Sequence, residues 1–168
     1  QTEQDSRVFA KFARIPVLDP ATPQDAYDLT KYGVELSEKF QIPVMLRPVM
    51  RVCHAREIIE MDEETNFTPN KGEFKRDVPR WGAVPRKDRL PQGVEQLNRI
   101  EVIKEYNWDN LLKPEFDKCE GKNKVLIITS GTGYGFTKET LSDLNLEADV
   151  VKVLMPYPLP VEQIRDRL

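Results

Sequence analysis

The segment from residue 15 to residue 49 restricts the fold of this chain more than any other part of its sequence. Apolar runs at residues 15–18 and 42–49 flank Thr22-Pro23-Gln24-Asp25, which has the features of a helix start. Threonine can accept a hydrogen bond from the first turn, proline fits the first helical position, and aspartate complements the helix dipole. Apolar residues then recur three and four positions apart as far as Phe40. A strand, a helix and a strand in this order predict two parallel strands joined by a right-handed crossover.

A second segment, residues 124–168, has the same pattern of strands and helices. Apolar strands are expected at 124–129 and 149–155, with a helix between them that ends near Leu144. A further helix is expected from residue 161 onward. Because two strands do not form a stable sheet without partners, the chain is expected to be a piece of a larger protein. Together the two segments predict the α/β class with parallel-sheet units.

Residues 50–90, which lie between these segments, differ from both in composition. They are dense in charged residues and contain several prolines, which is typical of a solvated connector. A helix is expected over about residues 90–106 and a loop at 107–123, and a short helix is expected at 5–14. The helix at 90–106 is predicted to turn five apolar side chains inward: Leu90, Val94, Leu97, Ile100 and Ile103.

The composition argues against several classes of function. With 25 Lys and Arg against 28 Asp and Glu, the net charge of −3 gives no electrostatic attraction to nucleic acid or to anionic membranes. No apolar run reaches the roughly 20 residues that a membrane helix needs, and residues 1–6 lack the apolar core of a signal peptide. The two cysteines, Cys53 and Cys119, are widely separated and favour reduced thiols in a cytoplasmic protein over a disulfide framework.

The glycine-rich turn Gly131-Thr132-Gly133-Tyr134-Gly135 has two interpretations. Its place between a strand and a helix suits a phosphate-binding loop, so a nucleotide-binding domain is one hypothesis. The spacing G-x-G-x-G differs from the dinucleotide motif, however, and the next strand ends in Met155 and Pro156 instead of an acidic residue. A tight, closely packed turn therefore accounts for the glycines better.

Several short motifs follow one another along the chain in an informative order. They are Glu3-Gln4-Asp5-Ser6-Arg7, Ile15-Pro16-Val17-Leu18, Lys31-Tyr32 with Glu35-Leu36-Ser37-Glu38, Arg51-Val52-Cys53-His54-Ala55-Arg56, Ile128-Thr129-Ser130-Gly131 and Tyr157-Pro158-Leu159-Pro160. Each motif is modest alone, but their order and spacing resemble the large (alpha) subunit of indolepyruvate:ferredoxin oxidoreductase, a 2-oxoacid:ferredoxin oxidoreductase. The resemblance extends over nearly the whole chain and is that of an internal fragment.

This resemblance implies a domain layout and an activity. Residues 1–60 would be the C-terminal part of a thiamine-pyrimidine-binding-type α/β domain, residues 61–121 a charged connector with one helix, and residues 122–168 the N-terminal part of a transketolase C-terminal-like α/β domain. The parent enzyme would be a cytoplasmic oxidoreductase that converts an aryl 2-oxoacid such as indolepyruvate, with coenzyme A, into acyl-CoA, carbon dioxide and reduced ferredoxin. It would use thiamine diphosphate, Mg²⁺ and [4Fe–4S] clusters, and it would contain a smaller second subunit.

Motifs that hold these cofactors are missing from the 168 residues. The sequence contains no G-D-G diphosphate motif and no cluster of cysteines, and the activating glutamate of thiamine enzymes would lie before Gln1. The fragment itself is therefore expected to be inactive, to bind no thiamine diphosphate tightly and to hold no metal. Self-association of the fragment is left open. The alternative function is a non-catalytic interaction module of transketolase-like fold.

Polar residues near the start of the chain are candidates for binding substrate. Gln4, Asp5 and Arg7 lie at the beginning of the first expected helix, and the corresponding stretch of transketolase-like domains lies near the thiamine. Open α/β sheets bind ligands at the carboxyl ends of their strands, which supports this hypothesis. In the alternative interpretation, Asp5 or Ser6 only caps the helix.

Arg51 and His54 follow the strand expected at 42–49 and are the second group of candidates. The guanidinium group of Arg51 is suited to bind the carboxylate of a 2-oxoacid, so Arg51 is a substrate-binding candidate. His54, the only histidine, is the candidate catalytic base or hydrogen-bond acceptor. In the alternative interpretation, His54 makes a structural hydrogen bond between two domains.

Overall fold

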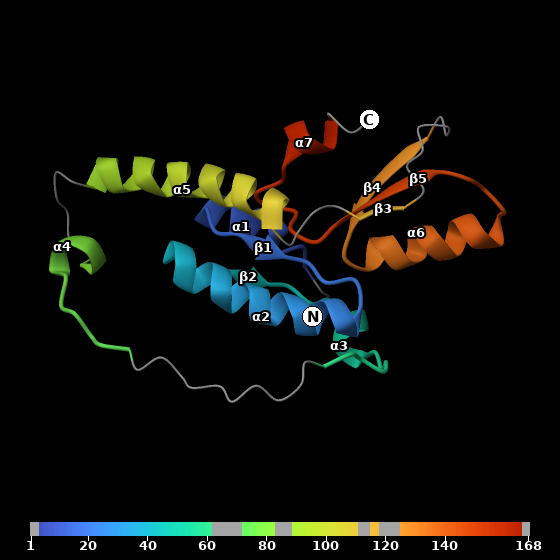
Figure 1. The fold of residues 1–168 in the computed structure, drawn as a ribbon, viewed down its shortest axis with the longest axis horizontal. Coiled ribbons are helices and arrows are strands. Elements are labelled where there is room, and N and C mark those ends of the chain that lie inside the picture. The colour runs from blue at the N-terminus through green and yellow to red at the C-terminus, as the bar shows by residue number, and fades with distance from the viewer. Residues whose placement is uncertain (1–3, 62–71, 83–88, 111–114, 118–124, 166–168) are drawn as a thin grey trace.

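The chain folds into short strands that alternate with helices (Figure 1). The computed structural model describes five stretches of the chain: residues 4–61, 72–82, 89–110, 115–117 and 125–165. The described strands are β1 (Val17–Leu18), β2 (Met45–Leu46), β3 (Glu115–Asp117), β4 (Leu126–Ser130) and β5 (Asp149–Val153). The described helices are α1 (Arg7–Ala13), α2 (Pro23–Phe40), α3 (Met50–His54), α4 (Val78–Trp81), α5 (Arg89–Asn110), α6 (Thr132–Asp143) and α7 (Val161–Arg165).

Two small sheets contain these strands. β1 and β2 form a parallel pair, and the second sheet has the order β3-β5-β4. In the second sheet β4 is parallel to β5, whereas β3 is antiparallel to it. The protein is therefore a mixed α/β protein with small parallel sheets, in agreement with the α/β class predicted from the sequence.

The first unit, β1-α2-β2, is the predicted parallel strand–helix–strand connection. α2 begins with a complete capping box, because the Thr22 hydroxyl accepts from Asp25 N at 3.1 Å and the Asp25 carboxylate accepts from Thr22 N at 3.2 Å. Both strands are shorter than the apolar runs that predict them. Prolines that lack an N–H donor flank both strands and restrict pairing there: Pro16, Pro20, Pro43 and Pro48.

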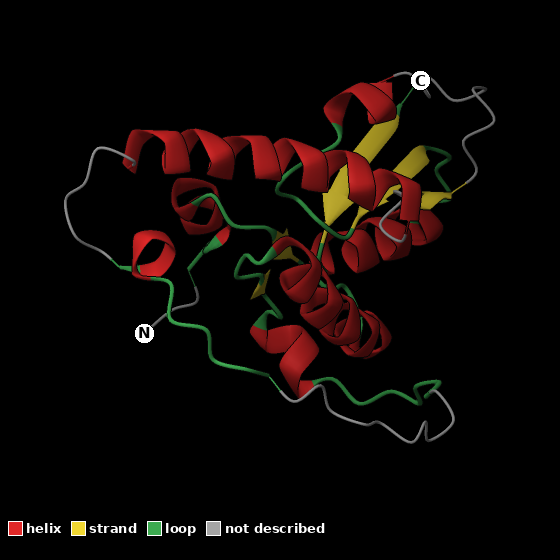
Figure 2. Ribbon diagram, turned by 60° about the vertical axis from the view of Figure 1, so that its left-hand side comes forward, coloured by secondary structure: helices red, strands yellow, loops and turns green. Residues whose placement is uncertain are grey.

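The main core lies between the small sheet and two helices, with α2 on one side and α5 on the other (Figures 1 and 2). Eight buried residues form it: Leu18, Leu29, Tyr32, Leu36, Ile42, Ile100, Ile103 and Met155. Ile100 and Ile103 point inward as predicted, but the prediction is wrong for the first half of α5. Leu90, Val94 and Leu97 are 79%, 50% and 46% exposed, because this half of α5 extends beyond the sheet.

Several elements fall where the sequence analysis expects no regular structure. Residues 107–123, expected as a loop, contain the end of α5 and the strand β3, and both α3 and α4 lie within the charged region expected as a connector at 50–90. β3 has three residues and pairs with β5, from which it is more than 30 positions distant. Such a pairing depends on long-range contacts and leaves too short a pattern to detect in the sequence.

The second unit contacts the first through the segment that follows β5. Val17 N donates to Tyr157 O and Asp19 N donates to Leu154 O, both at 2.8 Å. A second link is the ion pair of the buried Lys152 with Asp25, at 2.9 Å. These contacts fix the carboxyl end of β1 next to the sheet that contains β4 and β5.

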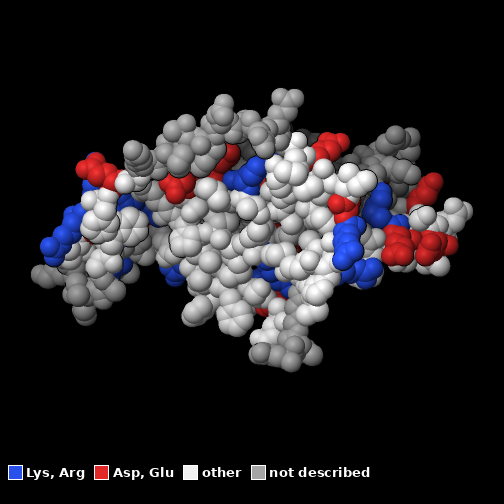
Figure 3. Space-filling model, turned by 90° about the horizontal axis from the view of Figure 1, so that it is seen from below, with Lys and Arg blue, Asp and Glu red and all other residues white. Residues whose placement is uncertain are grey.

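The surface carries both signs of charge. On the face drawn in Figure 3, described Lys and Arg residues lie beside Asp and Glu residues over much of the surface. Of the helices in the described stretches, none combines the length and the apolar character needed to cross a lipid bilayer.

Candidate functional site

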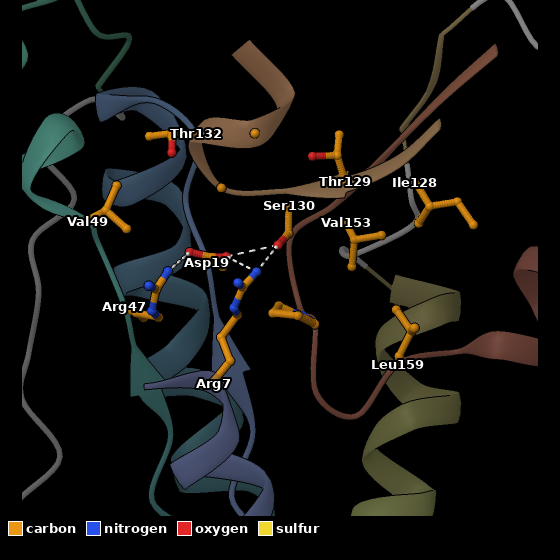
Figure 4. A pocket seen from close by; sticks show the side chains of 13 residues that line it. Arg7, Asp19, Arg47, Val49, Ile128, Thr129, Ser130, Thr132, Val153 and Leu159 are labelled. Atoms are coloured by element: carbon orange, nitrogen blue, oxygen red, sulfur yellow. Dashed lines mark hydrogen bonds and ion pairs between the residues drawn. The ribbon is translucent and has the colours of Figure 1, made fainter. Parts of the chain in front are cut away.

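A polar cluster lies where the carboxyl ends of three strands come together (Figure 4). Asp19 follows β1, Arg47 follows β2, and Ser130 is the last residue of β4. The three residues, together with Arg7 at the start of α1, line a cavity of about 460 Å³. Carboxyl ends of parallel strands are the usual place for ligand sites in α/β proteins, so this cavity is the candidate site.

Asp19 is the centre of the cluster. It is 1% exposed, and a buried carboxylate is destabilising unless partners compensate for its lost hydration. Arg47 Nη1 donates to Asp19 Oδ1 at 3.1 Å, and Ser130 Oγ donates to Asp19 Oδ2 at 3.0 Å. Arg7 Nη1 lies 3.7 Å from Asp19 Oδ2. Both carboxylate oxygens are therefore occupied by partners from other elements.

The glycine turn after β4 packs directly against this carboxylate. Gly131 has a φ of 54°, and a Cβ at this position would lie 2.9 Å from both oxygens of Asp19. A Cβ at Gly133 would lie 2.6 Å from Thr129 Oγ1. The closely packed turn predicted from the sequence is thus confirmed at Gly131 and Gly133, since a larger residue does not fit at either.

Arg7 connects the cluster to an exposed second carboxylate. Its Nε and Nη2 donate to the two oxygens of Asp5, each at 2.8 Å, and its Nη1 donates to Ser130 Oγ at 3.1 Å. The side-chain hydrogen bonds from Arg7 hold the pKa of Asp5 well below its usual range, and Asp5 in turn raises the pKa of Arg7. Arg47 lies near the same carboxylate, with Nη2 3.9 Å from Asp5 Oδ1.

The structure agrees in part with the alternative interpretation, in which Asp5 or Ser6 caps the first helix. Ser6 occupies the N-cap position of α1 without a side-chain capping bond, and its hydroxyl instead accepts from Arg47 Nε at 3.2 Å. Asp5 Oδ1 accepts from Arg7 N at 3.0 Å. Asp5 therefore both satisfies a backbone donor at the start of α1 and orients the guanidinium group of Arg7.

The wall of the cavity combines polar and apolar side chains. Guanidinium and hydroxyl groups come from Arg7, Arg47, Ser130 and Thr132. The apolar lining comes from Val49, Ile128, Val153, Pro156 and Leu159. Such a cavity suits a ligand that combines an anionic group with an apolar body, because arginine binds carboxylates with charge-assisted hydrogen bonds.

The other candidates from the sequence lie outside this cavity. Gln4 is exposed, and His54 is exposed in the last turn of α3. The Arg51 guanidinium lies over the ring of Phe136, 4.4 Å from its centroid, and lines a smaller cavity of about 220 Å³. Thr132 borders both cavities. Asp5 contacts Arg7 but does not itself line the larger cavity. Substrate binding by Gln4, Asp5, Arg7 and Arg51 and catalysis by His54 stay predictions.

Sequence reasoning missed Asp19, Arg47 and Ser130 as site residues. A signal exists for Asp19 and Ser130, because each directly follows an expected apolar strand, whereas Arg47 lies inside the run expected at 42–49 and follows a strand only because β2 ends at Leu46. Their partnership has no sequence signal, since 28 positions separate Asp19 from Arg47 and 111 separate it from Ser130. Within the described stretches, no three residues among His, Cys, Asp and Glu lie close enough together to hold a metal ion.

Curated proteins that resemble this chain share one description. Indolepyruvate oxidoreductase subunit IorA of Thermococcus kodakarensis is 41% identical over 167 residues, which are 95% of this chain and 25% of that subunit. The subunits of the same description from Pyrococcus abyssi and Archaeoglobus fulgidus are 37% and 33% identical, over 95% and 99% of the chain. The chain spans about a quarter of the length of these relatives. The resemblance inferred from the motifs is confirmed, whereas no family model matches the sequence.

Proposed function

We propose that this chain, which is similar over nearly its full length to part of subunit IorA, forms part of an indolepyruvate oxidoreductase subunit. The observation that carries the proposal is the 41% identity over 95% of the chain. The parent enzyme oxidatively decarboxylates aryl 2-oxoacids with coenzyme A and transfers the electrons to ferredoxin. It acts in the cytoplasm together with a smaller second subunit.

In this proposal the chain contributes a substrate-facing cavity. Arg7 and Arg47 present guanidinium groups to the cavity, and a substrate carboxylate forms charge-assisted hydrogen bonds with them. The apolar lining, which includes Ile128 and Leu159, accommodates the aryl group. Arg51 lines the neighbouring cavity, which shares Thr132 with the first.

The cofactors of the parent enzyme do not fit the residues of this chain. Thiamine diphosphate supplies the carbanion chemistry when bound to the parent. A [4Fe–4S] cluster needs about four cysteines, whereas the sequence contains two, Cys53 and Cys119. The G-D-G motif for the Mg²⁺-bound diphosphate does not occur in it either. We infer that thiamine diphosphate, Mg²⁺ and the clusters are bound by other parts of the parent enzyme.

The test of the proposed function uses the complete subunit that carries this chain, produced together with its partner subunit. Ferredoxin reduction is followed with coenzyme A and one 2-oxoacid at a time. The proposal expects indolepyruvate to be oxidised with a higher kcat/KM than pyruvate or 2-oxoglutarate. If no 2-oxoacid supports the reduction of ferredoxin by the cofactor-loaded complex, the proposed function is wrong and the alternative, a non-catalytic interaction module, replaces it.

A second test concerns the chain by itself. Isothermal titration of the 168 residues with thiamine diphosphate and Mg²⁺ is expected to give no saturable heat, because the diphosphate motif is missing from the sequence. A dissociation constant in the micromolar range would instead assign the cofactor site to this chain.

A further inference from the structure

Two carboxylates contact the same pair of guanidinium groups but differ in their surroundings. Asp19 contacts Arg47 at 3.1 Å and Arg7 at 3.7 Å, and Asp5 contacts Arg7 at 2.8 Å and Arg47 at 3.9 Å. The side chain of Asp19 is 1% exposed, whereas that of Asp5 is 48% exposed. A ligand carboxylate that binds these guanidinium groups must therefore share them with one or both aspartates.

Asp19 is held in place on every side. Its backbone N–H donates to Leu154 O at 2.8 Å, and its oxygens accept from Arg47 and Ser130. Gly131 closes the remaining side so tightly that an added Cβ would lie 2.9 Å from both oxygens. Moving this carboxylate would take from Arg47, whose side chain is only 13% exposed, its hydrogen-bonded counter-ion, which is unfavourable.

The side chain of Asp5 is held less tightly than that of Asp19. It precedes the first helix, half of its side chain is in solvent, and water can replace Arg7 as its partner. Ion pairs at such exposed positions contribute little to stability, because hydration of the separated charges compensates for their loss. Its carboxylate lies 2.8 Å from Arg7 Nη2 and 3.9 Å from Arg47 Nη2. Asp5 does not itself line the cavity, but it contacts the two guanidinium groups that do, and these groups are suited to bind an incoming carboxylate.

We propose that Asp5 is an exchangeable counter-ion and Asp19 a fixed positioning residue of one carboxylate site. The carboxylate of a ligand in the cavity takes the place of Asp5 beside Arg7 and Arg47, while Asp19 and Ser130 hold both guanidinium groups in position. This proposal rests on the proposed function, from which it takes the class of ligand, a carboxylate with an apolar body.

The test measures binding of indole-3-propionate, a carboxylate without a reactive 2-oxo group, and of its neutral amide to the complete two-subunit protein. Asp5→Asn removes the competing charge and is expected to raise the affinity for the acid about two- to fivefold, the range expected for an exposed ion pair. Asp19→Asn is expected to lower the affinity for the acid by at least about tenfold, as the loss of a buried charge partner predicts. Affinity for the amide changes little in either variant, because it carries no charge.

Matched variants separate positioning from general damage. Glu95→Gln breaks an exposed ion pair, to Arg99 at 2.6 Å, outside the cavity and leaves the affinity for the acid unchanged. If Asp19→Asn does not fold, Ser130→Ala takes its place, because it removes the hydroxyl between Arg7 and Asp19. This variant is expected to lower the affinity for the acid more than the affinity for the amide.

The outcomes decide each part of the proposal. If Asp5→Asn leaves the acid affinity unchanged or weakens it, exchange of Asp5 is wrong. If Asp19→Asn, or Ser130→Ala in its place, weakens acid and amide equally, the positioning role is wrong. Turnover of indolepyruvate by the unmodified enzyme tests the proposed function separately. The proposed function can therefore be correct while this inference is wrong. The enzyme can also bind the acid without turning over indolepyruvate, in which case the proposed function is wrong.

Discussion

At the scale of single residues, the burial of Asp19 explains why glycine occupies position 131. The carboxylate fills the space that a side chain at this position would need, and the φ of 54° is one that residues with a Cβ adopt at a cost. Gly135, four positions later in α6, differs in both respects. Nothing lies within 4 Å of a Cβ added there, and its backbone is helical.

These two glycines give a pair of predictions with opposite signs. Gly131→Ala is expected to lower the free energy of unfolding by about 1–3 kcal/mol through backbone strain and the clash with Asp19. Gly135→Ala is expected to raise it by up to about 1 kcal/mol, because alanine favours the helix. Urea unfolding of both variants is the measurement. Equal stabilities for Gly131→Ala and the wild type would show that the turn has room for a side chain.

Residue-level prediction from the sequence depends on a local signal. Its place at a helix start makes Arg7 a candidate, and Arg7 lines the cavity, while its role in substrate binding stays a prediction. The role of Asp19 has no such local signal, because its hydrogen-bond partners Arg47 and Ser130 are distant in sequence. A sequence pattern records which residues follow a strand, but not which strand ends meet in space.

At the scale of elements, α2 is predictable because its start signal is contained in four consecutive residues. Thr22 and Asp25 form the reciprocal capping bonds that their types and spacing predict. The inner face of α5 is less predictable. Its apolar residues recur along the whole helix, but only the part next to the small sheet finds a partner surface, so that Ile103 is buried and Leu90 is not.

The capping box of α2 gives a prediction at this scale. Thr22→Ala is expected to lower the free energy of unfolding by about 0.5–2 kcal/mol, because the N–H of Asp25 loses its acceptor. Thr30→Ala is the control, since Thr30 is an exposed residue inside the same helix and alanine is the better helix former. Thermal unfolding of both variants checks this. A Thr22→Ala protein as stable as Thr30→Ala would mean that the cap contributes nothing.

At the scale of the whole molecule, the two α/β units share more contacts than the sequence suggests. Their separation into residues 1–60 and 122–168 follows from periodicity and stays a prediction. The ion pairs of Asp19 with Arg47 and of Asp25 with Lys152 lie at or across the junction, and Met155 belongs to the core of the first unit. Such long-range contacts leave no periodic signal, so the sequence predicts the units better than their junction.

The charge network at this junction makes stability depend on pH. The hydrogen bonds from Arg7 hold the pKa of Asp5 below that of an unfolded aspartate, which is about 3.9. The contribution of Asp5 to stability is therefore complete above this unfolded value and is lost as the pH falls toward the lower folded value. Because Asp5 is half-exposed, the contribution is expected to stay below about 1 kcal/mol.

Unfolding by urea at about pH 5 and about pH 2.5 measures this contribution. The difference in stability between the wild type and Asp5→Asn is expected to shrink at the lower pH, because Asp5 of the unfolded chain is then largely protonated, so that protonation favours unfolding of the wild type. A difference that stays constant or grows toward low pH would show that Asp5 is not stabilised by Arg7.

The central claim is that the cavity of Arg7 and Arg47 binds the substrate carboxylate of an indolepyruvate oxidoreductase. Its most direct test is the KM for indolepyruvate of Arg7→Gln in the complete enzyme, with Arg99→Gln, outside the cavity, as control. The account predicts a KM raised at least about tenfold, as the loss of a charge-assisted hydrogen bond implies. It predicts a kcat within about twofold of the wild type, because the carboxylate is bound equally in the ground and transition states. A KM that is the same in Arg7→Gln, Arg99→Gln and the wild type would contradict it.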